Sequence, residues 1–193
     1  MRKMILLCIT AILAFTPVNV NAFDIYMETI GEAIPTEDGY LWVSGIGITN
    51  DAYDQVLLCI KEAQIFDLRT GFSISEQDIY EGDCVRVMYY LSPVTDTDVA
   101  HAVEVYVHAG ETGSADFIVV ASDNIWYSNG NCSFMTTDGK YRIIIDEETD
   151  ILDEYGYELS WEEIEPGMEM FVWAAIVTAS FPGQVVPDKI VLR

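Results

Sequence analysis

Two stretches of the chain repeat one pattern, and this repetition dominates what the sequence predicts about the fold. Residues 64–75 read QIFDLRTGFSIS, and residues 150–160 read DILDEYGYELS, with a one-residue gap at the turn. Each stretch has an apolar pair, an aspartate, a glycine turn and a step from an apolar residue to serine. Because internal self-similarity marks tandem structural units, we expect two copies of one domain.

The similarity extends beyond these stretches in both directions. Residues 78–87 (DIYEGDCVRV) correspond to 163–172 (EIEPGMEMFV), and the upstream and downstream matches pair residues 53–60 with 138–145 and residues 102–105 with 189–192. The copies therefore account for nearly all of the chain after its first 22 residues. We expect one domain over 23–112 and a second over 113–193.

Apolar residues alternate with a period of two, which is typical of β-strands. The only helical patterns are 75–80 and 160–165, where a serine N-cap precedes acidic residues that suit the helix dipole. The runs rich in valine, isoleucine and aromatic residues, bounded by Gly, Asp, Asn and Pro, are 40–48, 56–60, 85–91 and 103–107 in the first copy and 117–122, 141–145, 168–177 and 189–192 in the second.

Three strands, a short helix and two further strands is the order of the small Greek-key barrel of the OB type. The Gly82-Asp83 step suits a tight turn into the following strand. The sequence therefore predicts an all-β fold of two tandem OB-like small β-barrels, each with one short helix. An SH3-like barrel and an Ig-like sandwich remain open, because short strands with turn signals suit either fold.

The first copy resembles a repeat of uncharacterised secreted proteins from clostridia and their relatives. The residues that carry the resemblance lie in the segment from Ile65 to Tyr90, chiefly the string EGDCVRV at 81–87 and the pair Tyr89-Tyr90. The second copy matches less well, since Asp83 and Tyr89-Tyr90 become Met168 and Ala174-Ala175. In that family the repeat sometimes lies beside copper amine oxidase-like stalk domains. The resemblance implies a secreted or cell-wall-associated bacterial protein and no particular activity.

The amino terminus has the three parts of a secretory signal peptide. A basic start at 1–3 precedes an apolar run at 5–15, and Val20-Asn21-Ala22 offers small residues for cleavage. The apolar run is about half the roughly 20 residues that span a bilayer, so we expect a cleaved signal peptide over 1–22 and no membrane insertion afterwards.

The chain is strongly acidic, which limits its partners. Of its 193 residues, 32 are Asp or Glu and 9 are Lys or Arg, and loss of the signal peptide changes the formal charge from −23 to −25. Phosphate backbones are bound through Lys and Arg, so this charge excludes nucleic-acid binding. It leaves glycans, basic proteins or cations as partners at the cell envelope. The sequence does not specify the oligomeric state.

Three cysteines remain after cleavage: Cys59, Cys84 and Cys132. An odd number permits at most one internal disulfide. Cys59 and Cys84 lie in strand-like runs, where a buried thiol acts as a small apolar side chain, and a bridge between these two remains the alternative.

The sequence holds no recognisable catalytic set, and we expect a protein that is not an enzyme. Its two histidines, His101 and His108, are seven residues apart on one expected strand and would face opposite sides. Nucleophilic catalysis requires a nucleophile beside a base, and zinc requires grouped His or Cys ligands.

The densest acidic run, at 146–150, contains the metal-ligand candidates Asp146, Glu148 and Asp150. A turn carrying several carboxylates can bind Ca²⁺ weakly. The corresponding residues 61–64 of the first copy, KEAQ, lack such ligands, and a solvated acidic hairpin is the alternative. No other cofactor is expected.

Four aromatic residues in or next to turns are the ligand-binding candidates: Trp126, Tyr127, Tyr155 and Tyr157. Exposed aromatic rings stack on sugar faces or anchor protein interfaces. We therefore expect a secreted, non-catalytic binding or interaction module at the cell surface, with a glycan or a protein as ligand. The alternatives are a self-assembling structural component of the cell wall or extracellular matrix, and a secreted enzyme or enzyme inhibitor.

Overall fold

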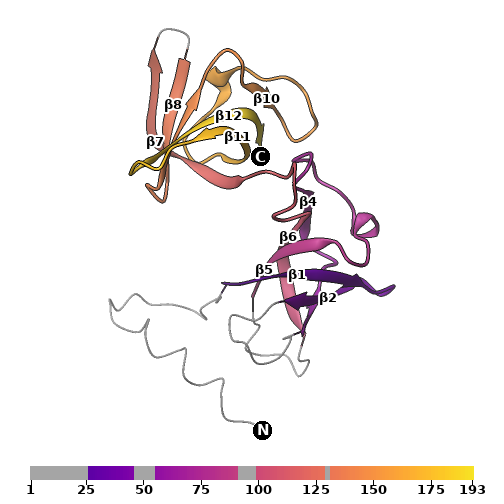
Figure 1. Ribbon diagram of the computed structural model, residues 1–193. Coiled ribbons are helices and arrows are strands. Elements are labelled where there is room, and N and C mark those ends of the chain that lie inside the picture. Colours follow the sequence, from indigo (N-terminus) through magenta and orange to yellow (C-terminus); the bar gives the residue numbers. More distant parts are fainter. Residues whose placement is uncertain (1–25, 46–54, 91–98, 129–130) are drawn as a thin grey trace, which may run out of the picture.

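The computed structural model describes residues 26–45, 55–90, 99–128 and 131–193 (Figure 1). The expected signal peptide, residues 1–22, lies outside these ranges. The described chain forms two six-stranded sheets and two short 3-10 turns, which confirms the all-β prediction. No helix in the described part of the chain is long and apolar enough to cross a membrane.

The first sheet has the strand order β3-β2-β1-β5-β6-β4, with an additional parallel pairing of β3 and β6. Each of the strands β1, β2, β3 and β5 therefore has a neighbour on both sides, and β6 pairs with β3, β4 and β5. The elements are β1 (Tyr26–Pro35), β2 (Tyr40–Gly45), β3 (Gln55–Cys59), β4 (Gln64–Asp67), the 3-10 turn η2 (Glu76–Asp78), β5 (Cys84–Tyr90) and β6 (Ala100–Val107).

The second sheet repeats this arrangement with the order β10-β12-β11-β7-β8-β9 and an additional parallel pairing of β12 and β9. In both copies the short strand that follows the third strand pairs in parallel with the last strand. The elements are β7 (Phe117–Ser128), β8 (Asn131–Thr136), β9 (Tyr141–Ile145), β10 (Asp150–Leu152), the 3-10 turn η3 (Trp161–Glu163), β11 (Glu169–Val177) and β12 (Gly183–Leu192).

Alternation of apolar and polar residues places one side of each sheet in a core. In β5 every second residue is buried, including Val85 and Val87, because successive side chains of a strand point to opposite faces. Each copy has its own cluster of buried apolar side chains. Leu41 and Leu58 lie in the first cluster, and Phe134 and Ile143 lie in the second.

The sequence predicted most of these strands but missed four of them. The predicted range 141–145 coincides with β9, whereas β1, β4, β8 and β10 were not predicted.

The two expected helices are each one 3-10 turn. Capping boxes begin both turns, one between Ser75 and Asp78 and one between Ser160 and Glu163. The Ser75 hydrogen bonds lower the pKa of Asp78.

The three described cysteines are free thiols, so the structure contains no bridge between Cys59 and Cys84. Cys132 is fully buried in the second core, and burial raises the pKa of its thiol to about 11. Burial and the Glu111 and Glu32 carboxylates also raise the pKa of Cys84.

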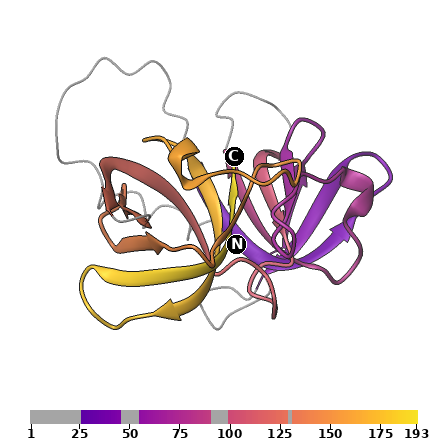
Figure 2. The same ribbon diagram turned by 90° about the horizontal axis from the view of Figure 1, so that it is seen from above.

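A third buried cluster joins the two copies. It contains Phe66, Leu68, Tyr106 and Ala109 from the first copy and Phe171 and Val191 from the second. The Phe171 ring centroid lies 5.5 Å from that of Phe66 and 6.0 Å from that of Tyr106. Viewed from above, the two sheets lie on either side of this junction (Figure 2).

Arg193 crosses the junction at its polar margin. Its guanidinium carbon lies 3.8 Å from the Phe66 ring centroid, and its nitrogens pair with Glu104 at 3.1 Å and Glu169 at 2.8 Å. Only 9% of the Arg193 side chain is exposed. Burial raises the pKa of Glu169, although the Arg193 charge acts to lower it. Arg193 therefore neutralises one carboxylate from each copy within a partly dry environment.

The glycine turns of the repeated motif also lie at this junction. Gly71 has a φ of 85°, and a Cβ there would lie 2.8 Å from Val191 of the second copy. Gly156 has a φ of 84°, and a Cβ there would lie 3.1 Å from Phe72 of the first copy. Each copy thus packs its motif turn against the other copy.

Replacing Gly71 with alanine should destabilise the protein more than replacing Gly82. Both glycines have positive φ, but a Cβ at Gly82 would meet no atom within 4 Å. Gly82→Ala should cost about 1 kcal/mol of unfolding free energy from backbone strain alone. Gly71→Ala should lower the free energy of unfolding by roughly a further 1–3 kcal/mol, because the added methyl group overpacks the junction. Urea denaturation of both variants measures these losses. Equal losses in the two variants would contradict the packing role of Gly71.

Removing the guanidinium of Arg193 should also destabilise the fold. We expect Arg193→Met to lower the free energy of unfolding by about 2–3 kcal/mol, because it leaves Glu104 and Glu169 partly buried without a counter-charge. The control is Arg69→Met, since Arg69 pairs with Glu111 while 52% of its side chain is exposed. That variant should lose less than about 1 kcal/mol. If Arg193→Met lost as little unfolding free energy as Arg69→Met, the ion pairs at the junction would be dispensable.

Thiol titration should find three free thiols in residues 23–193 unfolded without reductant. In the native protein Cys132 should react far more slowly than after unfolding, because it is buried and its thiol is protonated at neutral pH. A single reactive thiol in the unfolded protein would instead reveal a disulfide.

Candidate functional site

A tryptophan, an arginine and two polar side chains share the outward face of the second sheet. Trp126 on β7 lies opposite Ser133 on β8, and Arg142 on β9 lies opposite both Met135 on β8 and Gln184 on β12. Residues directly opposite one another, or two apart on one strand, point to the same side of a sheet. Trp126, Ser133, Arg142 and Gln184 therefore form one surface, which we call the Trp126 face.

Direct contacts hold three of these side chains together. The Arg142 guanidinium carbon lies 5.2 Å from the Trp126 ring centroid, and an Arg142 nitrogen donates a hydrogen bond to Ser133 Oγ at 2.9 Å. Trp126 retains 46% exposure, and Gln184 is also exposed. The arrangement combines an aromatic plane that solvent can reach with side chains able to donate and accept hydrogen bonds.

Arg142 differs from the other arginines in the described part of the chain. Arg69, Arg86 and Arg193 each form a salt bridge with an acidic residue, whereas Arg142 has no carboxylate within 4.0 Å among the described residues. Its charge is held by the tryptophan ring and a hydroxyl group instead. Arg142 is therefore a partly buried guanidinium without a carboxylate partner among the described residues, and its Nε is buried with no hydrogen-bond partner.

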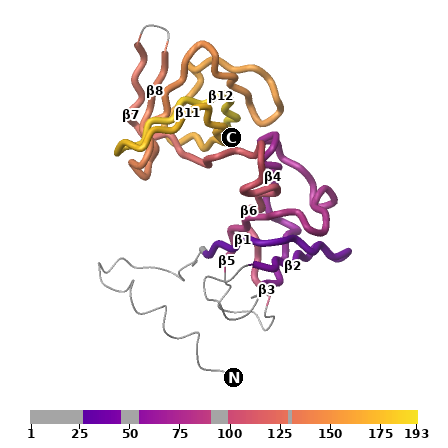
Figure 3. Tube along the Cα trace, viewed as in Figure 1, coloured from indigo at the N-terminus to yellow at the C-terminus, as the bar shows by residue number. Residues whose placement is uncertain are grey.

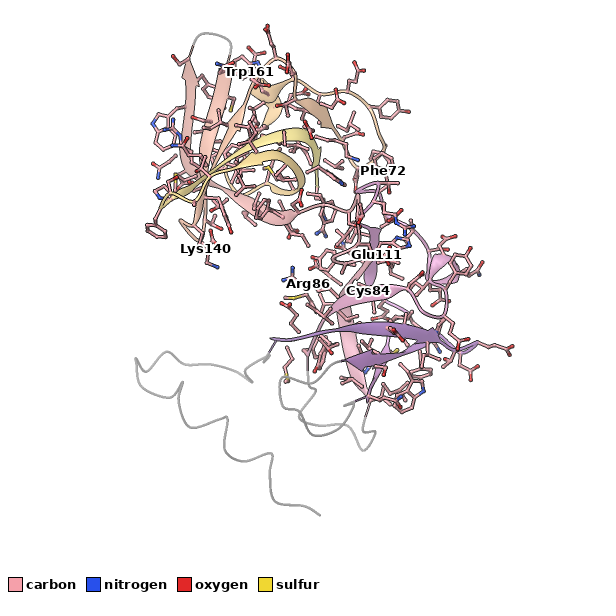
Figure 4. The ribbon with its side chains drawn as sticks, viewed as in Figure 1. Phe72, Cys84, Arg86, Glu111, Lys140 and Trp161 are labelled. Carbon is pink, nitrogen blue, oxygen red and sulfur yellow. The ribbon has the colours of Figure 1, made fainter. Side chains whose placement is uncertain are left out.

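Tyr127 does not belong to the Trp126 face. It lies opposite the buried Cys132, its ring is 5.2 Å from the Trp161 ring, and its hydroxyl donates to the Ile164 carbonyl at 3.4 Å. Trp161 lies on the 3-10 turn η3 of the second copy (Figure 4). Tyr127 is half exposed but covers the end of the second core.

Tyr155 and Tyr157 lie in the turn between β10 and η3, away from the β7–β8 hairpin (Figures 1 and 2). Their exposed fractions are 76% and 71%. Both backbone N–H groups donate to Asp153 Oδ1, at 2.9 and 2.8 Å, so this carboxylate shapes the turn. The glycine between the tyrosines packs on Phe72, which Figure 4 places beside the second copy. The structure therefore separates these tyrosines from Trp126.

The acidic run begins with a turn that already uses one of its carboxylates. Asp146 Oδ1 accepts hydrogen bonds from the Glu148 N–H at 3.0 Å and from the Thr149 hydroxyl at 3.3 Å, while Asp150 begins β10. Within the described ranges no group of three or more His, Cys, Asp or Glu side chains is placed to hold a metal ion. Weak Ca²⁺ binding by Asp146, Glu148 and Asp150 stays a prediction.

His108 forms a cluster that the sequence did not reveal. It lies just past the end of β6 with a φ of 63°, and not on the strand with His101 as expected. Its Nδ1 lies 2.8 Å from Asp67 Oδ1, and its Nε2 lies 3.7 Å from Asp83 Oδ1. The nearby Ser114 hydroxyl donates to the His108 carbonyl at 2.6 Å and not to the ring. The cluster therefore fixes a turn next to the junction without pairing a nucleophile with a base.

Comparisons with known proteins do not assign the chain to a family. No protein-family model and no curated protein matches it. Among solved structures it is similar to Drosophila Unr CSD456, with a TM-score of 0.24 and 11% sequence identity. The similarity covers 89% of this chain, and the chain spans 61% of the length of that structure. A likeness of this degree carries no argument about fold or function.

Proposed function

We propose that the protein is a secreted, non-catalytic module of two OB-like barrels that binds a neutral glycan at the cell surface. The observation that carries the proposal is the Trp126 face, where an exposed indole lies against the Arg142 guanidinium, which in turn donates a hydrogen bond to Ser133. A pyranose ring presents an apolar side that stacks on an indole and hydroxyl groups that bond to guanidinium and amide groups.

The strand pairing supports the barrel part of the proposal. In each copy the third, second, first, penultimate and last strands pair in succession, and the parallel pairing of the last strand with the third links the two ends of this series. This order is that of the OB fold, which binds oligonucleotides or oligosaccharides across its second and third strands. The Trp126 face includes those strands, β8 and β9, of the second copy.

The charge of the chain supports a neutral glycan over other ligands. A formal charge of −23 repels nucleic acids and anionic polysaccharides over a distance of about 10 Å at moderate ionic strength. Trp126 and Arg142 can still engage an uncharged sugar, because stacking and hydrogen bonding act at contact distance. Secretion rests on the sequence pattern of residues 1–22, and the same pattern supports a location outside the cell or on its wall.

Replacing Trp126 should abolish glycan binding without unfolding the protein. We expect residues 23–193 to co-sediment with insoluble glucan, chitin or purified peptidoglycan, and neutral oligosaccharides to compete. Trp126→Ala should weaken retention at least tenfold, which is about 1.4 kcal/mol. Arg142→Met should weaken it by a smaller factor, because it removes hydrogen bonds but leaves the ring. A thermal melt of each variant checks that the fold persists.

Tyr155→Ala is the matched control, since Tyr155 is more exposed than Trp126 but lies outside the face. This variant should bind as tightly as the unchanged protein. Loss of binding in Tyr155→Ala with retention in Trp126→Ala would move the site to the β10–η3 turn. Failure of the unchanged protein to bind any of the three polysaccharides would contradict the proposed function.

A further inference from the structure

The ends of β11 and β12 form a hairpin at one side of the second copy (Figure 3), and the β12 end of this hairpin pairs with β9. Ile176 is 57% exposed, Val177 is 50% exposed and Phe181 is 88% exposed. Removal of such side chains from water is favourable. Exposed apolar residues gathered on one hairpin therefore indicate a surface that a partner covers.

The same hairpin is free of charge in a chain that is otherwise densely acidic. Residues 170–187 contain no Asp, Glu, Lys, Arg or His, while Glu169 and Asp188 lie directly on either side. This uncharged stretch includes the exposed side chains of the hairpin and both strand segments that form it. Its surface differs from the acidic remainder in charge as well as in hydrophobicity.

One edge of the hairpin lacks a neighbouring strand among the described residues. β11 pairs with β7 only as far as Val172, whereas its pairing with β12 continues to Val177. Asp116, the residue just before β7, lies next to the point where the β7–β11 pairing ends, and its carboxylate accepts a hydrogen bond from the N–H of Ala174 at 2.8 Å. The following residues, 175–177, present a short strand edge of the kind that pairs with another chain.

We propose that a second copy of this chain covers the hairpin, through an isologous contact in which the two β11 edges meet across a two-fold axis. The charge pattern favours this occupant. A basic partner would be attracted to the acidic surfaces and would gain nothing at the uncharged hairpin. Two copies repel one another wherever their acidic surfaces meet, so they approach at least cost through the hairpin, whose own residues 170–187 carry no charge, although the Asp116 carboxylate lies beside Ala174 at its edge.

Because the contact is apolar and the rest of the surface is repulsive, salt should change the affinity of the dimer in a characteristic direction. Screening reduces the repulsion between two strongly acidic chains and leaves the apolar contact in place. The dimer should therefore tighten as ionic strength rises, whereas a contact built on ion pairs weakens. A single hairpin per copy buries less than a standard interface, so we expect weak association.

Sedimentation velocity of residues 23–193, which contain every described residue, tests the proposal. Runs over a range of protein concentrations in about 0.02 M and about 0.5 M NaCl separate the screened and unscreened states. We expect a monomer–dimer equilibrium that is several-fold tighter in high salt. Ile176→Glu should weaken it at least tenfold, and Ile176→Ser should weaken it less, because serine removes apolar area without adding charge.

Tyr80→Glu is the matched control. Tyr80 is 65% exposed, lies on the first copy, and gains the same charge in this substitution. In high salt, the Tyr80→Glu variant should dimerise nearly as tightly as the unchanged protein. A monomer at all concentrations, a dimer that weakens with salt, or equal effects of Ile176→Glu and Tyr80→Glu would each overturn the proposal. Ile176 lies opposite Val186, which is two residues from Gln184 of the Trp126 face, so glycan retention of Ile176→Glu is also measured, at a protein concentration where the unchanged protein is monomeric.

Discussion

The aromatic contact between Phe66, Tyr106 and Phe171, with the Arg193 guanidinium on Phe66, is the interaction on which the arrangement of the two copies depends. Each copy has its own core, and neither core extends into the other. The junction cluster is the apolar contact that joins them, and Arg193 compensates the two carboxylates at its margin. Removing either contribution would leave apolar rings or uncompensated carboxylates at the boundary.

The repeated motif acquires a physical explanation at this junction. Gly71 and Gly156 occupy equivalent turns that each approach a side chain of the other copy. A Cβ at Gly71 would lie too close to Val191, at 2.8 Å, and a Cβ at Gly156 would make a tight contact of 3.1 Å with Phe72. Lys189 adds a polar link, since its ammonium group donates to the Thr70 carbonyl at 3.1 Å and lies 3.6 Å from the Trp173 ring centroid. Burial lowers the pKa of Lys189, although Asp67 and Asp150 act to raise it. The conspicuous sequence signal therefore concerns packing between the two copies, and the proposed binding surface lies elsewhere.

The fold class and the duplication could be predicted from the sequence because both leave local signals. Strand β9 has five apolar or long side chains in a row and was located to the residue, whereas β1 carries glycine, acidic residues and threonine and gave no apolar run. Trp126 could be named as a candidate from its turn. Ser133, Arg142 and Gln184 could not, since their shared face depends on the register of β8, β9 and β12. The pairing of His108 with Asp67 likewise joins residues 41 positions apart.

Cooperative unfolding tests the central claim that the junction makes the two copies one structural unit. Differential scanning calorimetry of residues 23–193 compares the calorimetric and van't Hoff enthalpies of unfolding. A junction that holds the copies together predicts one transition in which the two enthalpies agree. Two separate transitions, or a calorimetric enthalpy about twice the van't Hoff value, would show that the copies unfold independently and would contradict the account.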